Sequence, residues 1–500
     1  MSGAPPDPGA AAAPRGPRRV SGGTLYKLVH CERRLWLDVH APALAAPRDA
    51  HDEVLRERGR ALEEGVARTF AGLEGPVLRP GVTLEDAARE TRALLGTGRP
   101  LHQPVLLAAD DRRVGVPDFL YWEDGRVVVR EAKLALRPAA RPDILLQLAH
   151  YGALAAEVAG APVARLEVTN GRGETQAVTP PAPARLAAAV ARAAALLGDA
   201  PEPDLLLAHS TCESCPFYAH CWDRAQAERR VEVLSEVWRS RAAALHAEGV
   251  CTFDELAARD PGSLRHPELR RGARRIVAEA RAHANGAPVW LEPPRLPAGR
   301  QPVWFDLEGD PDGEAAEVPI YLWGLAVEEA DAPRPEAVFA DLDAGGDRRG
   351  WERFVARALE IAAAAPHAVW VHWHQYEVTW LHRYQRRYGA PAAFERALLA
   401  PGATFDLHAA LHRAVRLPLR SYSIKHVAPW LGFAWSIPES GSAWSVAQFH
   451  HARATADPEE RARRLAAIAR YNADDLLAMR AVWRWLEANA PRAPAGAEHA

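Results

Sequence analysis

Residues 113–133 constrain this chain most, because they have the pattern of a β-hairpin that carries charge where a buried hairpin would not. Two arms rich in β-branched and aromatic residues flank an Asp-Gly pair, which favours a tight turn. Asp118 lies on the first arm, and Glu131 and Lys133 lie at the end of the second. Side chains two apart on a strand point to one face, so Glu131 and Lys133 share it. Two carboxylates and an ammonium converging at a strand end predict a divalent-metal site suited to phosphodiester hydrolysis.

The use of lysine supports a function for Lys133. Lys and Arg together number 61, yet only positions 27, 133 and 425 are Lys. A chain that uses Arg for almost every cation, but keeps Lys at 133, indicates a need for a compact ammonium that can lose a proton. The alternative is a salt bridge on the surface of an edge strand.

Length and composition set broad limits. Five hundred residues predict about three domains, and a hydrophobic fraction of 48% supports real cores. The formal net charge is −3, so nucleic-acid binding would need local patches, such as the arginines within 265–275 or within 383–387. No run of about 18 apolar residues occurs, so no membrane association is expected. The first 20 residues lack the apolar core of a signal peptide, and we therefore expect a cytoplasmic protein.

The hydrophobic pattern is that of an α/β protein. Helices are expected over 24–37, 52–72, 84–95 and 143–159 and from 404, and strands over 104–108, 164–169, 302–310, 320–326 and 368–373. The expected order is a disordered tail (1–20), a first domain (21–225), a small helical, helix-hairpin-like connector (226–285), a Pro-rich linker (286–300), a last domain (301–490) and a second disordered tail (491–500).

Three of the five cysteines fall within ten positions, at Cys212, Cys215 and Cys221. Disulfides are rare in large cytoplasmic proteins, so this spacing indicates a metal or cluster site, which needs a fourth ligand. Cys31 would complete an all-thiolate set, which favours a 4Fe–4S cluster. His220 would instead complete a zinc site.

The helix expected over 143–159 places Gln147 and Tyr151 on one face, one turn apart. They could lie beside the hairpin and contact a phosphate or a base. Ordinary polarity of a helix surface is the alternative.

A second group of acidic residues lies in the last domain. Asp306 and Glu308 alternate on a strand directly after an apolar run, and Glu377 follows a later strand. Tyr471 and Asp475 lie one turn apart on a C-terminal helix. Two metal ions about 4 Å apart need about this many carboxylates, and Tyr471 could orient the attacking water.

The first 225 residues resemble the RecB-like PD-(D/E)xK nucleases, including their iron–sulfur branch. The resemblance is carried by Pro117-Asp118, Glu131-Ala132-Lys133, Gln147 with Tyr151, and the split cysteine set. It implies a restriction-endonuclease-like fold, with Mg²⁺ or Mn²⁺ on Asp118 and Glu131 and with water activated by Lys133. It also implies a 4Fe–4S cluster on Cys31, Cys212, Cys215 and Cys221.

Residues 300–490 look like the YprB-type RNase H-like 3′–5′ exonuclease domain of the DEDD class. Asp306 and Glu308 match its first motif, Glu377 its second, and Tyr471 with Asp475 its third. The resemblance implies metal ions held by Asp306, Glu308 and Asp475. The whole arrangement is similar to a family of RecB-like nucleases that joins these two modules.

Two positions depart from these families. Many RecB-like nucleases carry a His on an early helix as a further metal ligand, but the matching stretch 59–64 has none, so Glu63 or Glu64 is expected to replace it. Glu377 stands where DEDD exonucleases usually have Asp. Asp406 could add a carboxylate there or could cap its helix.

The leading hypothesis is a metal-dependent nuclease, exonucleolytic on single-stranded DNA or duplex ends, or on RNA, that serves repair, recombination or defence with a helicase or repair partner. The rival hypothesis is a nucleic-acid-binding scaffold for such a partner, whose catalytic sites are impaired. The missing His and the Glu at 377 favour the rival. No Gly-x4-Gly-Lys-Ser/Thr stretch occurs, so no ATP motor is expected in this sequence.

Overall fold

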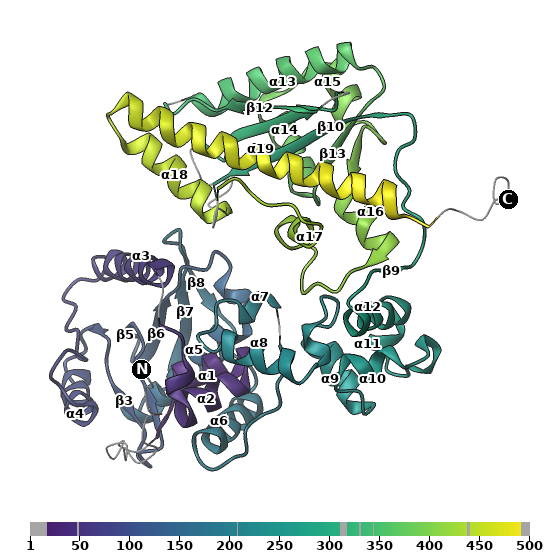
Figure 1. Ribbon diagram of the computed structural model, residues 1–500. Helices are drawn as coiled ribbons and strands as arrows, with labels where there is room; N and C mark the ends of the chain where they lie inside the picture. The colour runs from purple at the N-terminus through teal and green to yellow at the C-terminus, as the bar shows by residue number, and fades with distance from the viewer. Residues whose placement is uncertain are drawn as a thin grey trace, which may run out of the picture. The chain divides into compact units, whose positions relative to one another are not determined.

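The computed structural model describes residues 18–47, 50–207, 209–310, 318–329, 332–343, 345–437 and 441–491. The chain divides into two compact units, Met1–Ala227 and Glu228–Ala500, which we call the N-terminal and C-terminal units (Figure 1). The two predicted tails fall mostly outside the described residues, although Val20 already lies in a strand. Within the described residues, no helix is long and apolar enough to cross a membrane.

The N-terminal unit contains two sheets and eight described α-helices. The larger sheet has the order β2-β5-β6-β7-β8, with β6 and β7 parallel and the other neighbours antiparallel, and the smaller has the order β1-β4-β3. The strands are β1 (Val20–Ser21), β2 (Leu101–His102), β3 (Leu106–Leu107), β4 (Arg113–Gly115), β5 (Phe119–Glu123), β6 (Arg126–Ala132), β7 (Val163–Thr169) and β8 (Thr175–Val178).

Helices cover these sheets, and α5 makes the crossover that the parallel pair β6 and β7 requires. Its apolar side chains, such as Leu148 and Leu154, share one core with Val129 of β6 and Leu166 of β7. The helices are α1 (Gly22–His30), α2 (Glu32–His40), α3 (Ala50–Ala67), α4 (Leu84–Leu95), α5 (Pro142–Ala159), α6 (Pro183–Leu197), α7 (His209–Cys212) and α8 (Tyr218–Ala227).

The single helix expected over 24–37 is wrong, because the chain leaves the helical path at Cys31 and forms α1 and α2 on either side. Cys31 has an extended backbone, with φ −167° and ψ 116°, and its Sγ accepts a hydrogen bond from the Arg34 N–H at 3.4 Å. A periodic apolar pattern continues through such a break and therefore does not signal it. The thiol expected to complete the cysteine set thus ends one helix and caps the next.

The hairpin expected over 113–133 is present only from Phe119 onward. Strands β5 and β6 pair antiparallel across Asp124-Gly125, both of which have positive φ, but β4 belongs to the smaller sheet. Pro117 has no N–H to donate to a ladder, so pairing stops there and Asp118 lies just before β5. Of the strand expected over 104–108, only Leu106–Leu107 is a strand.

The C-terminal unit is built on a five-stranded sheet of order β12-β11-β10-β13-β14. Strands β10, β11 and β12 are antiparallel neighbours, and β13 and β14 run parallel to β10. The strands are β9 (Val289–Trp290), β10 (Gln301–Gly309), β11 (Ile320–Val327), β12 (Arg334–Phe339), β13 (Ala368–His372), β14 (Thr404–Asp406) and β15 (Val415–Arg416). The helix expected from residue 404 therefore begins only after β14, at Leu407.

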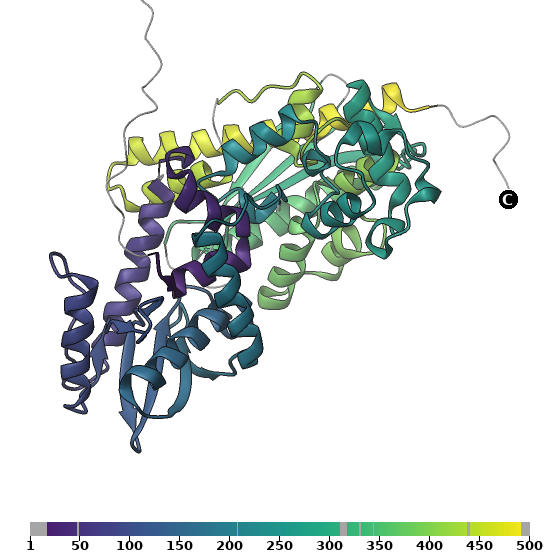
Figure 2. The same cartoon turned by 90° about the horizontal axis from the view of Figure 1, so that it is seen from below.

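The helices of this unit are α9 (Arg239–Ala247), α10 (Phe253–Ala257), α11 (Pro267–Arg270), α12 (Ala273–Asn285), α13 (Gly346–Ala364), α14 (Tyr376–Tyr388), α15 (Ala392–Phe394), α16 (Leu407–Ala414), α17 (Ile424–Trp430), α18 (Ser442–Ala454) and α19 (Pro458–Asn489). The longest, α19, runs along the sheet in both views (Figure 1 and Figure 2).

Alternation along β10 determines which side chains meet α19. Val303 and Phe305 belong to one core with Phe354 of α13, whereas Trp304 packs against Trp483 of α19 with ring centroids 5.7 Å apart. Because alternate residues share a face, the next even-numbered positions of β10, 306 and 308, also face α19. Residues of α19 about two turns before Trp483 therefore lie over the acidic end of β10.

The Pro-rich stretch 286–300 is held against the sheet rather than free. Its strand β9 pairs antiparallel with β15, and Trp290 packs beside the core that contains Trp304. Arg416 of β15 is fully buried, and its Nη2 donates to Glu236 Oε1, before α9, at 2.9 Å. These contacts attach the helices α9 to α12 to the sheet within one compact unit.

Candidate active site

Three carboxylates meet at the end of β10. Oxygens of Asp306, Glu308 and Asp475 lie within 4.8 Å of one another, and the last two side chains are buried. Burial raises the pKa of all three groups, and their mutual repulsion raises it further for Asp306 and Glu308. The pKa of Glu308 reaches about 8. The positive charges near the cluster therefore do not balance the negative charge that its three carboxylates would carry when ionised.

Polar partners from α19 itself and from two other segments hold these carboxylates in place. Asn472 Nδ2 donates to Asp306 Oδ2 at 2.7 Å. Lys425 Nζ and Trp435 Nε1 both donate to Asp475 Oδ1, at 2.5 Å and 2.6 Å. Sequence reasoning did not find these partners, although Lys425 carried the same signal as Lys133, a retained lysine in an arginine-rich chain.

Tyr471 and Lys425 lie side by side next to the cluster. Lys425 Nζ is 4.1 Å from the centroid of the Tyr471 ring and 4.2 Å from that of Trp435, which places the ammonium between two aromatic faces. Burial and the nearby carboxylates of Asp475 and Glu308 raise the pKa of Tyr471. The phenol therefore keeps its proton and can donate a hydrogen bond beside the cluster.

Glu377 also lies near the cluster, although it is not one of the three residues whose oxygens are within 4.8 Å of one another. Its carboxylate is near enough to raise the pKa of Asp306, and burial raises its own pKa to about 8. Among the described residues, its buried Oε2 has no hydrogen-bond partner, and His372 Nδ1 lies 3.8 Å away. Asp406 instead caps α16 by accepting from the Ala409 N–H at 2.9 Å.

These residues fit a divalent cation. Oxygen donors gathered from a strand and a helix are the ligands that Mg²⁺ and Mn²⁺ prefer, and clustered carboxylates with raised pKa values gain most from a bound positive charge. The unpartnered oxygen of Glu377 gives a further donor beside them. The structure thus brings together the five positions that the sequence indicated in this unit.

A second group of charges lies in the N-terminal unit around Glu131. Its Oε2 is 2.5 Å from Lys133 Nζ, and its Oε1 accepts from the Asp118 N–H at 2.9 Å. Asp118 Oδ2 in turn accepts from the Ala132 N–H at 2.8 Å. Burial and the Glu131 carboxylate raise the pKa of Asp118 well above its usual range. Burial opposes the charge of Lys133, but Glu131 and Asp118 outweigh it and raise the pKa of the ammonium.

Glu63 of α3 lies beside this group, and Glu64 is exposed. Glu63 Oε1 accepts from Gln103 Nε2 at 2.8 Å and lies 2.7 Å from His102 Nε2. Burial opposes ionisation, but the bonds from His102 and Gln103 prevail and lower the pKa of Glu63. His102 of β2 therefore places an imidazole beside Glu63, and sequence reasoning missed it because it lies 39 residues away along the chain.

Gln147 and Tyr151 are buried rather than on a helix surface. Gln147 Nε2 donates to Tyr151 Oη at 2.9 Å, and burial together with the Glu131 carboxylate raises the pKa of Tyr151. A Cβ at Gly22 would lie 2.4 Å from Tyr151 Oη, and one at Gly115 would lie 2.8 Å from its ring. These two glycines therefore make the space in which the phenol reaches the charged group.

The four cysteines of the predicted set lie near one another, and none of them forms a disulfide. Burial raises the pKa of Cys215, with the thiols of Cys31 and Cys212 close enough to add to it. Burial likewise raises the pKa of Cys221 to about 11, and Cys215 and Cys31 add to that. Folding thus brings Cys31, from the break between α1 and α2, close to cysteines in and between α7 and α8.

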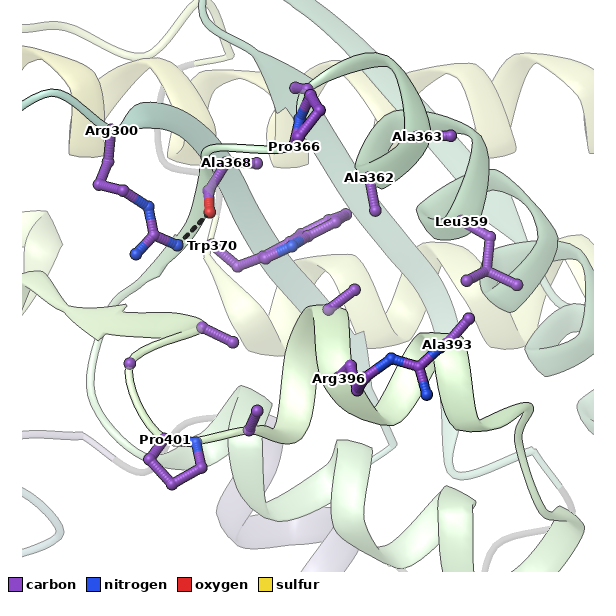
Figure 3. Close-up of a pocket in the computed structure, with 15 residues that line it drawn as sticks. Arg300, Leu359, Ala362, Ala363, Pro366, Ala368, Trp370, Ala393, Arg396 and Pro401 are labelled. Carbon is purple, nitrogen blue, oxygen red and sulfur yellow. Dashed lines mark hydrogen bonds between the residues drawn. The ribbon is translucent and has the colours of Figure 1, made fainter.

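A separate pocket of about 510 Å³ lies where β13 and β14 begin, away from the acidic end of β10 (Figure 3). Its walls are mostly Ala and Pro around Trp370, and Arg300 donates to the main-chain carbonyls of His367, at 2.9 Å, and Ala368. Among the described residues, no carboxylate lines this pocket, and none of the predicted site residues does.

Comparison with known proteins bears on the C-terminal unit. Residues 303–487 match the family model of the RNase H superfamily. A comparison with curated proteins gives no match. The matched span contains the acidic cluster and every strand of the five-stranded sheet from Val303 onward. The C-terminal unit therefore contains an RNase H superfamily domain, which indicates a nuclease-type hydrolase function on nucleic acids.

Proposed function

We propose that this protein is a Mg²⁺- or Mn²⁺-dependent nuclease whose RNase H-like domain removes nucleotides from single-stranded DNA ends, in the 3′–5′ direction of the DEDD class. The observation that carries the proposal is the set of Asp306, Glu308 and Asp475 oxygens within 4.8 Å at the sheet end of an RNase H superfamily domain. Repair, recombination or defence, with a helicase or repair partner, is the proposed setting.

Asp306, Glu308 and Asp475 would hold the cation, with Glu377 available beside them. A bound divalent cation supplies Lewis acidity to a phosphodiester and charge to offset that of the transition state. Tyr471, which retains its proton, would donate to and orient the attacking water. Lys425 and Trp435 fix Asp475 through its Oδ1, and Asn472 fixes Asp306, so the ligand oxygens are held before substrate arrives.

We propose a second, RecB-like nuclease centre in the N-terminal unit, on a restriction-endonuclease-like fold. Asp118 and Glu131 would hold the cation there, with Glu63 or His102 as a further ligand. The raised pKa of Lys133 makes it a charged donor that orients water and stabilises charge on the phosphate, rather than a base. Gln147 and Tyr151 would position the substrate or the water beside it.

The four clustered thiols would hold a 4Fe–4S cluster that joins the first helices of the unit to its last. A zinc ion is the alternative. Visible absorption by the purified protein, together with iron and zinc analysis, separates the two.

The test of the nuclease function uses an end-labelled single strand and an end-labelled duplex with Mg²⁺, with and without EDTA. Asp306→Asn should lower exonucleolytic cleavage by ~100-fold or more, because it removes electrostatic stabilisation that acts on the transition state. Lys133→Ala, added to Asp306→Asn, should remove the Mg²⁺-dependent cleavage that Asp306→Asn alone retains. Asp343→Asn, at an exposed carboxylate of the same unit, is the matched control and should cut as wild type does. If the Asp306→Asn, Lys133→Ala double variant cuts as fast as wild type, the protein is not this nuclease.

A further inference from the structure

The C-terminal unit has a groove of about 870 Å³ beside the start of α12, apart from the acidic cluster. Its lining carries five positive side chains and one negative one, Glu292. The positive residues are Arg270, Arg271, Arg274, Arg275 and Arg413. Four of them come from the α11–α12 region and the fifth from α16, so both the helical segment and the RNase H-like domain contribute to the groove.

Most of these guanidiniums do not hold the fold together. Arg275 Nε lies 3.2 Å from Glu236 Oε2. In the part of the chain that the structure describes, the side chains of Arg270, Arg271, Arg274 and Arg413 are exposed and make no hydrogen bond or ion pair. Like charges gathered without partners repel one another, whereas the planar guanidinium matches phosphate geometry. The groove is therefore suited to a chain of phosphates.

An exposed indole adjoins the groove. Trp238 is 43% exposed, an unusual state for such a large apolar side chain. The Arg241 guanidinium stacks on its ring, with Cζ 3.6 Å from the centroid, and Arg241 Nη2 donates to the carbonyl of Arg271 in the groove wall at 3.0 Å. The indole is thus fixed beside the arginines with aromatic surface free to stack on a base.

Helix α16 connects the groove with the acidic cluster. Asp406, whose charge acts on Glu377, caps the first turn of α16, and Arg413 lies seven residues later. At 1.5 Å per residue, the two positions are about 10 Å apart along the helix axis. Both belong to one compact unit, so a strand held in the groove has a defined position relative to the catalytic carboxylates.

We infer that this groove binds single-stranded nucleic acid, with the arginines contacting consecutive phosphates and Trp238 stacking on a base. Guanidiniums along a groove beside an exposed aromatic ring are the combination that single strands require, because their bases are unpaired and free to stack. A duplex would offer the phosphates but not the base faces. Binding of a single strand by the groove does not depend on the proposed function. Only its role does: the groove would hold the strand whose end reaches the acidic cluster.

The test measures binding of a fluorescently labelled oligothymidylate to the full chain by anisotropy in EDTA, so that no cleavage occurs. Each phosphate contact contributes about 0.7 to the salt slope of single-strand binding, so Arg270→Ala with Arg274→Ala should lower the slope by about 1.4. With equal affinity at 1 M salt, this corresponds to ~25-fold weaker binding at 0.1 M. Arg270→Lys with Arg274→Lys keeps the charges and should restore most of the slope.

Trp238→Ala should weaken binding of the single strand by ~10-fold and binding of the matching duplex far less. Arg185→Ala with Arg396→Ala is the control pair, since both side chains are exposed, lie outside the groove and have no side-chain partner among the described residues. Its affinity and salt slope should equal those of wild type.

The outcomes separate this inference from the proposed function. If wild type fails to bind the oligonucleotide, or if the groove pair and Trp238→Ala bind as the control pair does, the groove inference is wrong even where Mg²⁺-dependent cleavage is present. If groove-dependent binding is found but Asp306→Asn leaves cleavage unchanged, the groove inference holds and the assignment of the acidic site fails. Equal weakening of single-strand and duplex binding by Trp238→Ala would overturn the single-strand preference.

Discussion

The acidic cluster should destabilise the C-terminal unit when no cation is bound, and Glu308→Gln tests this. Glu308 is 6% exposed, and burial together with the Asp475 carboxylate raises its pKa to about 8, against an ordinary value of 4.5. The folded protein therefore binds this proton more tightly than the unfolded chain does. The stabilisation of the folded protein by this bound proton is complete below about pH 4.5 and is lost as the pH rises through about 8.

The size of the effect follows from the same values. At 1.36 kcal/mol for each pH unit between the two pKa values, the loss at high pH is on the order of 5 kcal/mol. This is an upper limit, because Asp306 and Asp475 share the charge and ionise more easily once Glu308 is removed. We expect Glu308→Gln to reduce the loss of folding stability at high pH by at least about 1 kcal/mol, since one buried charge is gone.

Urea unfolding followed by tryptophan fluorescence measures this, because 13 of the 16 tryptophans lie in residues 228–500. In EDTA, wild type should lose stability between pH values of about 5 and about 9, and Glu308→Gln should lose clearly less. Mg²⁺ should restore wild type at the higher pH and should restore the variant less, because one ligand is missing. Glu352→Gln, at an exposed glutamate of α13, is the control. Equal losses and equal Mg²⁺ effects in wild type and Glu308→Gln would refute the reasoning.

Three further predictions concern positions around the proposed sites. Gly324 faces Asp306 across the β10–β11 ladder, and a Cβ there would lie 1.7 Å from Asn472 Oδ1. Gly324→Ala should therefore displace Asn472 and lower exonuclease kcat by ~10-fold or more in a steady-state cleavage assay. An unchanged kcat would contradict the role of Asn472. Lys133→Arg, combined with Asp306→Asn, should abolish the Mg²⁺-dependent cleavage that Asp306→Asn alone retains, because a bulkier guanidinium does not fit the 2.5 Å contact with Glu131. Retained cleavage would show that any positively charged side chain suffices at position 133. Cys31→Ser should lower bound iron, measured by colorimetric analysis, and lower the thermal midpoint of the N-terminal unit, whereas Cys251→Ser, at an exposed thiol outside the set, should change neither.

Local geometry explains what could be predicted from the sequence. Asp306 with Glu308 and Tyr471 with Asp475 share faces because residues two apart on a strand, or four apart on a helix, point the same way. The structure places both pairs together, and it places Lys133 on Glu131 as the strand pattern predicts. Where a single residue ends an element, as at Cys31 and Pro117, the predicted element was too long.

The partners of those residues could not be predicted, because they come from segments far away in the chain. Asn472 reaches Asp306 across 166 residues, and His102 reaches Glu63 across 39.

The sequence by itself therefore predicted the residue pairs within each acidic group, the close spacing of Cys212, Cys215 and Cys221 and the α/β class, since these depend on spacing within one short segment. Only the tertiary structure decided how the carboxylates are supported, that His102 lies beside Glu63 and that Arg413 joins the arginines of α11 and α12 in one groove. The reason is physical: local spacing is set by backbone geometry, whereas contacts between distant segments depend on how the hydrophobic faces of α16, α19 and the sheet pack together.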